Sequence, residues 1–207
     1  LIPRPDTECV VEQALTLDLP AQARVLDLGT GTGAIALALA SERPDWNIIA
    51  SDSVNDAVAL AQSNAAALNL PIQVVKSDWF CQLADACFDQ GFDLIVSNPP
   101  YIASTDHHLC EGDVSFEPAS ALVSGADGLD DIRHIVATAP SWLNAGGWLL
   151  LEHGYDQAQA VRVLLQQQGF AQVHSRQDYG RNDRMTLGLW PMRTLDSRHN
   201  NKRSPSC

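Results

Sequence analysis

The sequence predicts an α/β fold in which a mainly parallel sheet is covered by helices on both faces. Short apolar runs alternate with helical patterns, a glycine-rich turn follows the first run, and a short polar turn joins the last two. Alternating strands and helices need crossover connections, which produce parallel strands with helices packed on either side. The 207 residues suit one domain, and 45% apolar side chains are enough for a packed core.

Seven strands are expected, each a short apolar run bounded by turn residues. They cover residues 24–28, 47–51, 72–76, 92–97, 148–152, 171–177 and 184–190. The turn at residues 178–183 is too short for a crossover, so the last two strands should be antiparallel.

Five helices are expected between these strands, at residues 7–17, 32–41, 55–68, 129–144 and 156–168. Pro44, Pro71 and the pair Gly146-Gly147 stand where helices should end, and Asn55 is expected to cap the third helix. Residues 102–127 contain few apolar side chains, and a loop of this length within a compact domain is often functional.

Charge and cysteine content narrow the class of protein. The net charge is −12; the last fifteen residues carry +3, so the rest of the chain carries −15. An acidic body disfavours general nucleic-acid binding. The five cysteines are scattered without a C-x-x-C pair, which favours free thiols in the cytoplasm. No run is apolar enough to span a membrane, and residues 1–6 are not a signal peptide but read like the middle of a protein.

A cofactor site is expected where the first strand ends. Residues 25–34 form a buried strand that runs into Gly29-Thr30-Gly31-Thr32-Gly33 and then a helix. Glycines let the backbone approach a ligand closely, and a helix N-terminus presents free N–H groups. Asp52 ends the next strand, 19 residues after Gly33, where a carboxylate can hold both hydroxyls of a ribose.

The glycine turn alone does not define which ligand the site binds. Gly29, Gly31 and Ala34 also satisfy a dinucleotide pattern, but residues for hydride chemistry are not evident. The other candidate is S-adenosylmethionine (SAM), with Asp78 for the adenine amino group and Trp79 for stacking. Asp27 is expected either beside the methionine ammonium or in a structural hydrogen bond to the turn.

The motif Asn98-Pro99-Pro100-Tyr101 follows the fourth strand and is the most informative stretch of the chain. The two prolines prevent helix formation and lack N–H groups, so a rigid corner with a side-chain amide, free carbonyls and an aromatic face results. Two acceptors and a ring suit a planar –NH2 group. An ordinary proline turn with Tyr101 as packing is the alternative.

Taken together, the glycine turn, Asp52 and the Asn-Pro-Pro-Tyr motif resemble SAM-dependent methyltransferases that act on amide or amino nitrogen. Residues 1–8 (Leu-Ile-Pro-Arg-Pro-Asp-Thr-Glu), 151–155 (Leu-Glu-His-Gly-Tyr) and the turn at 178–184 resemble the HemK/PrmC family in particular. The resemblance covers about residues 1–190. It implies the class I, Rossmann-like methyltransferase fold, with a seven-stranded, mostly parallel sheet containing one antiparallel strand.

The resemblance also implies a reaction. The family methylates the glutamine side-chain amide in the Gly-Gly-Gln loop of class I peptide-chain release factors, with S-adenosylhomocysteine as the product. Residues 1–192 would be the catalytic domain. Residues 193–207 are polar and lack periodicity, so a disordered tail is expected there, with a basic docking arm as the alternative. The family's helical N-terminal domain has no counterpart in this sequence. We expect a cytoplasmic monomer that binds neither nucleic acid directly nor a membrane.

Specific roles follow for the matched positions. Asn98, Pro99 and Tyr101 are expected to be catalytic, with Pro100 completing the substrate corner. We expect the Asn98 side-chain oxygen and the Pro99 carbonyl to accept both N–H bonds of the glutamine amide. The expected cofactor-binding residues are Asp27, Gly29, Thr30, Gly31, Thr32, Gly33, Asp52, Asp78, Trp79 and Asn98. The family also places Arg4, Asp6, Thr7 and Glu8 at the mouth of the site, where capping of a helix is the alternative for Asp6 or Thr7.

Other signals and readings carry less weight. His107-His108-x-Cys110-Glu111 fits no standard zinc spacing, so no metal is expected. His134 and His153 are interpreted as surface or packing residues, although His153 ends a strand near the site. Alternative functions are an adenine-specific DNA or RNA methyltransferase, a ribosomal-protein glutamine methyltransferase, a SAM-binding protein without catalysis, and a nicotinamide oxidoreductase.

Overall fold

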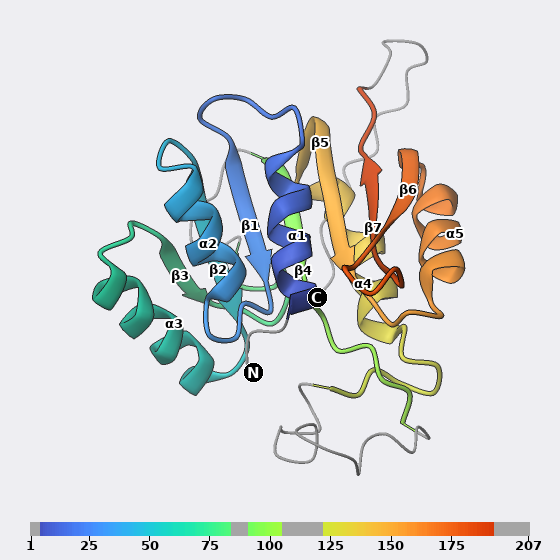
Figure 1. Ribbon diagram of the computed structural model, residues 1–207, viewed down its shortest axis with the longest axis horizontal. Coiled ribbons are helices and arrows are strands. Elements are labelled where there is room, and N and C mark those ends of the chain that lie inside the picture. The colour runs from blue at the N-terminus through green and yellow to red at the C-terminus, as the bar shows by residue number, and fades with distance from the viewer. Residues whose placement is uncertain (1–4, 84–90, 105–121, 193–207) are drawn as a thin grey trace.

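The computed structural model describes residues 5–83, 91–104 and 122–192. Within these ranges the chain forms one seven-stranded sheet (Figure 1). The strands are β1 (Arg24–Leu28), β2 (Asn47–Asp52), β3 (Gln73–Lys76), β4 (Phe92–Ser97), β5 (Leu143–Glu152), β6 (Ala171–Gln177) and β7 (Asp183–Leu189). The helices are α1 (Pro5–Leu15), α2 (Ala34–Glu42), α3 (Asn55–Leu68), α4 (Asp130–Thr138) and α5 (Ala158–Gln168), with a short 3₁₀ helix at Ala139–Ser141.

The strand order is β3-β2-β1-β4-β5-β7-β6. Strands β1 to β5 are parallel, whereas β7 lies antiparallel between β5 and β6. In Figure 1 the arrowheads of β1 and β5 point the same way and that of β7 points the opposite way. The predicted sheet, including the antiparallel pair, is therefore confirmed. The strand order reverses between β1 and β4, and such a switch point is where ligands bind in open α/β sheets.

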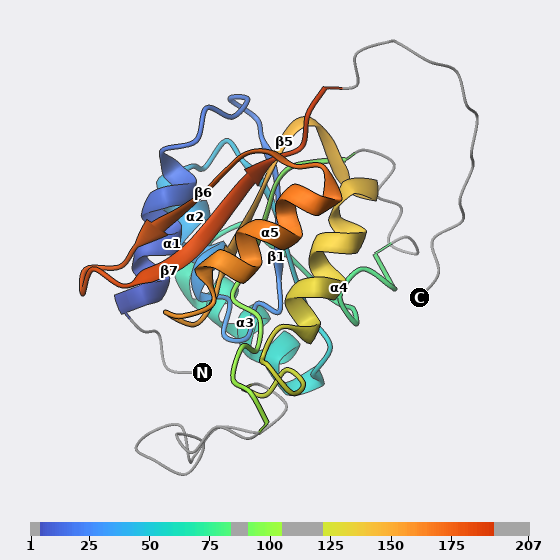
Figure 2. The same ribbon diagram turned by 90° about the vertical axis from the view of Figure 1, so that its right-hand side faces the viewer.

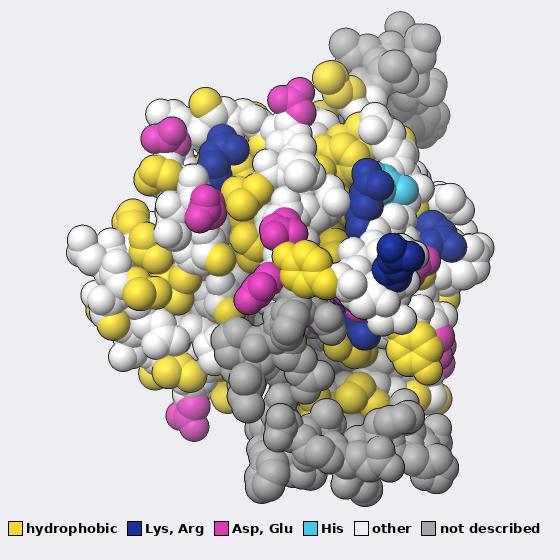
Figure 3. Space-filling view, viewed as in Figure 1, with side chains coloured by type: hydrophobic (Ala, Val, Ile, Leu, Met, Phe, Trp, Pro, Cys, Tyr) yellow, Lys and Arg dark blue, Asp and Glu magenta, His cyan; other side chains and the backbone are white. Residues whose placement is uncertain are grey.

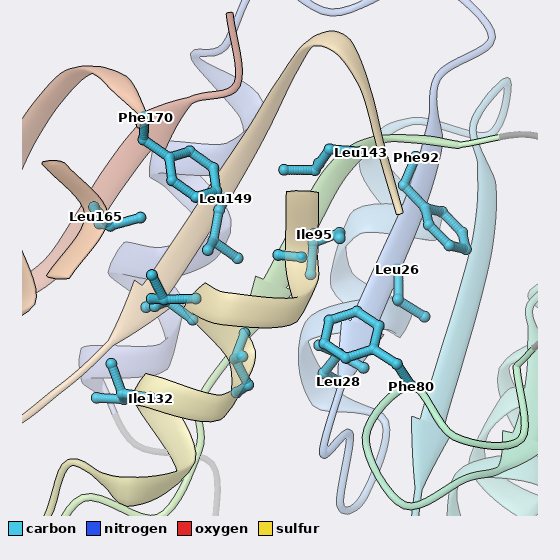
Figure 4. Packing of buried hydrophobic residues seen from close by; sticks show 14 of the residues in the cluster. Leu26, Leu28, Phe80, Phe92, Ile95, Ile132, Leu143, Leu149, Leu165 and Phe170 are labelled. Carbon is cyan, nitrogen blue, oxygen red and sulfur yellow. The ribbon is translucent and has the colours of Figure 1, made fainter. Parts of the chain in front are cut away.

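Helices cover both faces of the sheet. Figure 2 shows α4 and α5 on one face and α1 and α2 on the other. The first face buries a cluster that includes Leu28 of β1, Ile95 of β4, Ile132 of α4 and Phe170, which precedes β6; Figure 4 shows these side chains on the side of the sheet that α4 covers. A second cluster joins the opposite sheet face to α1 and α2. The two cores fix the sheet and therefore the positions of its carboxyl ends.

The structure corrects one predicted helix. Residues 129–144 were expected to be helical throughout, but α4 ends at Thr138, a 3₁₀ turn covers Ala139–Ser141 and β5 already begins at Leu143. Pro140 explains the change, because proline removes a helical N–H and clashes with the preceding turn. The early start of β5 comes from long-range pairing: Leu143 lies opposite Phe92, whose N–H donates to the Trp142 carbonyl at 2.7 Å.

The predicted N-cap of α3 is also wrong. Asn55 is the first helical residue, and Val54 occupies the cap position without a side-chain hydrogen bond. The Val54 N–H is bound by a carboxylate oxygen of Asp52 at 2.9 Å instead. The acidic residue at the strand end therefore organises the start of this helix.

Among the described residues, no helix has the length and apolar character needed to cross a membrane. Several predictions lie outside the described ranges: the role of Arg4, the middle of the 102–127 loop with its His107-His108-x-Cys110-Glu111 stretch, and the tail at 193–207.

Candidate active site

The carboxyl ends of β2, β1, β4 and β5 place the predicted site residues side by side. Leu28 lies opposite Ser51 on one side and Ser97 on the other, and Ser97 lies opposite Leu151. The residues that come directly after these four are Gly29, Asp52, Asn98 and Glu152. The Ser97 hydroxyl donates to the Leu28 carbonyl at 2.7 Å and locks the central pair at the switch point.

The glycine turn has the backbone that its sequence predicts. Gly29, Gly31 and Gly33 have φ values of 67°, 56° and 85°, in the region that side chains other than glycine rarely adopt. A Cβ at Gly33 would lie 3.1 Å from the Leu37 side chain and 3.3 Å from Ala61, so this glycine also allows close packing. No atom of the described residues lies within 4 Å of a Cβ placed at Gly31, so these residues leave the outer side of the turn open.

Asp27 lies beneath this turn and is only 1% exposed. Its Oδ2 accepts hydrogen bonds from the Thr30 hydroxyl at 2.6 Å and the Ala36 N–H at 3.2 Å. Its buried Oδ1 has no hydrogen-bond partner in the part of the chain that the structure describes. Burial raises the pKa of this carboxyl to about 7, the Asp52 charge acts in the same direction, and the two hydrogen bonds oppose them. The structural bond to the turn is thus present, and one oxygen is left for a cationic ligand group.

Asp52 is half-buried at the end of β2 and organises two loops. Its Oδ2 accepts the Gly31 N–H at 2.9 Å and its Oδ1 accepts the Val54 N–H at 2.9 Å. Because a carboxylate has about four acceptor positions, both oxygens retain capacity for the hydroxyls of a ribose. The carboxylate is therefore fixed in place beside the glycine turn before any ligand arrives.

Trp79 lies against the glycine turn. Its six-membered ring would lie 3.6 Å from a Cβ placed at Gly29. Its backbone has a φ of 46°, and its carbonyl accepts the Ser77 hydroxyl at 2.8 Å. The neighbouring Asp78 side chain is exposed. These positions bring both residues to the cofactor side of the edge.

The two threonines of the turn contribute differently from the glycines. Thr30 is buried and its hydroxyl donates to the Asp27 carboxylate, so its side chain orients that carboxylate. The Thr32 carbonyl accepts from the Asn64 side chain at 2.9 Å. Asn64 was missed by sequence reasoning, since an asparagine within a helix gives no signal of a distant partner.

The Asn-Pro-Pro-Tyr corner lies immediately across the switch point from the glycine turn. Pro99 is buried, whereas Asn98, Pro100 and Tyr101 are half-buried. Within the described ranges, neither the Asn98 side chain nor the Pro99 carbonyl makes a hydrogen bond, whereas the Tyr101 carbonyl accepts one from Gln157 at 2.9 Å. The two acceptors assigned to the substrate amide are thus uncommitted.

His153 is a packing residue here. It is fully buried after β5, with Nδ1 2.9 Å from the Gly154 carbonyl and Nε2 2.7 Å from the Thr186 hydroxyl. A carbonyl only accepts, so Nδ1 carries the hydrogen and Nε2 accepts from Thr186. Burial lowers the pKa of His153, opposed by the bond to Gly154, and the ring is held neutral.

Two of the predicted residues near the N-terminus lie in the described part of the chain. Thr7 is buried within α1, which begins at Pro5, and Glu8 is exposed.

On the face seen in Figure 3, Lys and Arg side chains gather over α5, β6 and β7. Arg184 of β7 lies 3.4 Å from Asp178, and Arg162 of α5 lies 3.9 Å from Asp183. No group of three or more His, Cys, Asp or Glu able to hold a metal occurs in the described ranges.

Solved structures with the same fold include a methyltransferase from Pyrococcus furiosus, with a TM-score of 0.69 and 17% identity over 93% of this chain and 85% of that chain. A second is the T. thermophilus 16S rRNA N2 G1207 methyltransferase in complex with AdoMet and guanosine, with a TM-score of 0.61 and 23% identity over 92% and 44% of the two chains. Both likenesses show the class I methyltransferase fold.

Sequence relatives are much closer. Residues 10–122 match the model of the Methyltransferase small domain family. The release factor glutamine methyltransferase of Pseudomonas aeruginosa is 60% identical over 92% of this chain and 68% of its own length, and that of Escherichia coli is 57% identical with the same coverage. That of Shewanella oneidensis is 53% identical, and the alignment covers 65% of its length, so the chain spans about two thirds of such relatives. The chain belongs to the release factor glutamine methyltransferase family.

Proposed function

We propose that this chain transfers a methyl group from SAM to the side-chain amide nitrogen of the glutamine in the Gly-Gly-Gln loop of class I peptide-chain release factors. The observation that carries the assignment is the corner across the switch point. It presents two uncommitted acceptors, the Asn98 side-chain oxygen and the Pro99 carbonyl, beside the glycine turn. Two acceptors match the two hydrogens of one primary amide.

The residues of the other half fit SAM. Asp27 offers a buried carboxylate oxygen without a partner among the described residues, which suits the methionine ammonium. The glycine turn, Asp52, and Asp78 with Trp79 are placed for the methionine, ribose and adenine parts, respectively. When bound, SAM supplies an electrophilic methyl group on a positively charged sulfur.

The corner's task is to make an amide nitrogen reactive. That nitrogen is a weak nucleophile because its lone pair is delocalised into the carbonyl. Acceptors at Asn98 and Pro99 hold both N–H bonds, so the lone pair is oriented and the positive charge that develops on nitrogen is stabilised. Tyr101 packs against the amide plane. The nitrogen forms a bond to the methyl carbon as the carbon–sulfur bond breaks, and S-adenosylhomocysteine leaves with the electron pair of that bond. The nitrogen then loses one proton to water, so no general base is needed.

We also retain three expectations from the sequence as proposals: action in the cytoplasm, a monomeric state, and no direct binding of nucleic acid. In support of the last, two of the three arginines on α5, β6 and β7 lie within 4 Å of an acidic side chain, and the chain carries a net charge of −12. Sedimentation tests the monomeric state, and a filter-binding assay with adenine-containing DNA tests the absence of nucleic-acid binding.

The test of function is methyl transfer from labelled SAM to three substrates in parallel: a class I release factor, its Gly-Gly-Gln variant with Gln→Ala, and adenine-containing DNA. We expect label on the first alone. Equal label on the Gln→Ala variant would exclude this glutamine as the acceptor, and label on DNA would move the assignment to a nucleic-acid enzyme.

A further inference from the structure

Gln157 holds three separate segments of the active-site edge through one side-chain amide. It precedes α5 and is half-buried. Its Nε2 donates to the Tyr101 carbonyl at 2.9 Å and to the Asp127 carbonyl at 3.2 Å, and its Oε1 accepts the Gly154 N–H at 2.8 Å. Two carbonyls need a donor and an N–H needs an acceptor, so the orientation of this amide is fixed by its partners.

These partners come from distant parts of the chain. Tyr101 ends the corner after β4 and is 56 residues from Gln157 in sequence. Asp127 belongs to the turn before α4, and Gly154 lies two residues after the end of β5. One side chain therefore ties the exit of the corner to the neighbouring strand end and to the turn that precedes α4.

The backbone at Gly128 is shaped to permit this contact. Gly128 has a φ of 74°, and a Cβ there would lie 2.2 Å from the Tyr101 carbonyl oxygen and 2.7 Å from the Gln157 Nε2. Any other residue would push the turn away from both groups.

The segments that contain Tyr101 and Asp127 also pair with each other through backbone hydrogen bonds that do not involve Gln157. The Ile102 N–H donates to the Leu122 carbonyl at 2.8 Å, the Ser124 N–H donates to the Ile102 carbonyl at 3.0 Å, and the Ser104 N–H donates to the Gly125 carbonyl at 2.9 Å. Gln157 lies at the end of this ladder that is nearest the corner. Its loss would remove the bond to the carbonyl of the peptide that joins Tyr101 to Ile102, while the N–H of that peptide keeps its bond to Leu122.

We propose that Gln157 is a positioning residue for the Asn-Pro-Pro-Tyr corner, a role that rests on the proposed function. It acts through the Tyr101 carbonyl and fixes the direction in which the corner presents the Asn98 and Pro99 acceptors. Reactions that depend on orientation tolerate little misplacement, and a shift of about 1 Å costs on the order of 100-fold in rate.

The first variant is Gln157→Ala. We expect the methyl-transfer rate at saturating SAM and release factor to fall about 10- to 100-fold, while the SAM dissociation constant stays within about twofold. The matched control is Gln168→Ala at the last residue of α5, because the Gln168 amide also donates to a backbone carbonyl, that of Ala137 at 3.4 Å, away from the corner. The control should retain the wild-type rate.

The second variant, Gln157→Glu, gives a signature that a purely structural role would not. A carboxylate keeps the acceptor for the Gly154 N–H but presents an oxygen to two carbonyls, whereas protonation restores one donor. The ratio of its rate to the wild-type rate should therefore rise as the pH falls from about 7 towards about 4, since a glutamic acid has an ordinary pKa of about 4.3. This ratio decides the question if Gln157→Ala fails to fold.

Hydrogen exchange of the backbone separates this proposal from the function on which it rests. Exchange of residues 98–104 and of the Gly154 amide should accelerate in Gln157→Ala and not in Gln168→Ala. Unchanged exchange, a Gln157→Ala rate within twofold of wild type, or a pH-independent Gln157→Glu ratio would each overturn the positioning role. A wild-type chain that leaves the release factor unlabelled would overturn the proposed function instead, whatever the exchange result.

Discussion

The two halves of the sheet's carboxyl edge are built differently. In the cofactor half, at the ends of β1, β2 and β3, Asp27 binds Thr30 three residues away, and Asp52 binds Val54 two residues away and Gly31 21 residues away. In the acceptor half, at the ends of β4 and β5, the anchoring bond spans 56 residues, from Gln157 to Tyr101.

The halves also differ in what they leave open. The cofactor half is largely committed, with Asp52 already bound to the Gly31 N–H, whereas Asn98 and the Pro99 carbonyl have no partner in the described ranges. The comparison teaches that the polar groups of one half are held by one another, whereas the other half leaves two acceptors available for the substrate amide that we propose.

The largest expected effect strikes the acceptor half. Asn98→Ala should lower the rate at saturating substrates about 100- to 1000-fold, because one of two acceptors for the developing charge is lost. The SAM dissociation constant, measured by calorimetry, should change by less than about threefold. A parallel loss of affinity and rate would show that the halves are not separate.

Asp52→Ala tests the opposite half. Losing the carboxylate removes charge-assisted hydrogen bonds worth about 1.5–3 kcal/mol, so SAM affinity should fall about 10- to 100-fold. The rate at saturating SAM should stay near the wild-type value. Asp56→Ala, an exposed change in the first turn of α3, is the matched control, and equal effects of the two variants on calorimetric affinity would refute the ribose assignment.

The pKa of Asp27 predicts a pH dependence of cofactor binding. With a value of about 7, this carboxyl is mostly protonated at about pH 6 and mostly ionised at about pH 8. A cationic ligand binds the ionised form, so SAM affinity should rise up to about 10-fold over this range, with release of a proton. Calorimetry in buffers of different ionisation enthalpy measures the proton, and Asp27→Asn should abolish the dependence.

The raised pKa of Asp27 also makes the free energy of unfolding depend on pH. The folded chain holds this proton more tightly than the unfolded chain does, so the contribution of Asp27 to the free energy of unfolding is largest below the ordinary value of 3.8. It is lost as the pH rises to about 7. Denaturant titrations of wild type and Asp27→Asn over this range should therefore converge towards low pH. Parallel curves would contradict the burial of an ionisable carboxyl.

The smallest effect is expected at Arg133, which pairs with Asp127 and Asp130 on the surface of the turn before α4. Exposed ion pairs contribute little because water screens them. Arg133→Ala should leave the methyl-transfer rate within about twofold of wild type. A loss as large as that of Gln157→Ala would assign the hold on this turn to the ion pair rather than to the Gln157 amide.

The difference between the halves also explains what could be predicted from the sequence. The glycine turn and Asp52 follow from local pattern, because strand, glycines and helix are consecutive. The bounds of β1 and β4 were predicted correctly for the same reason. The start of β5 at Leu143 was not, since it depends on pairing with Phe92, 51 residues earlier in the chain.

Single residues with distant partners escaped prediction. Gln157 stands before a helix, where glutamine is unremarkable, and its three partners meet only in the folded chain. Asn64 and Ser97 likewise act on backbone carbonyls of other elements. By contrast, Asn98 was identified because two prolines beside it give the corner a conformation that the sequence itself dictates.

The most direct test of the division into two halves is the methyl-transfer rate at saturating SAM for wild type, Asp52→Ala, Asn98→Ala and the double variant. We expect Asp52→Ala to match wild type and the double variant to match Asn98→Ala, since each half is perturbed independently. A saturated rate of Asp52→Ala as low as that of Asn98→Ala would contradict the account.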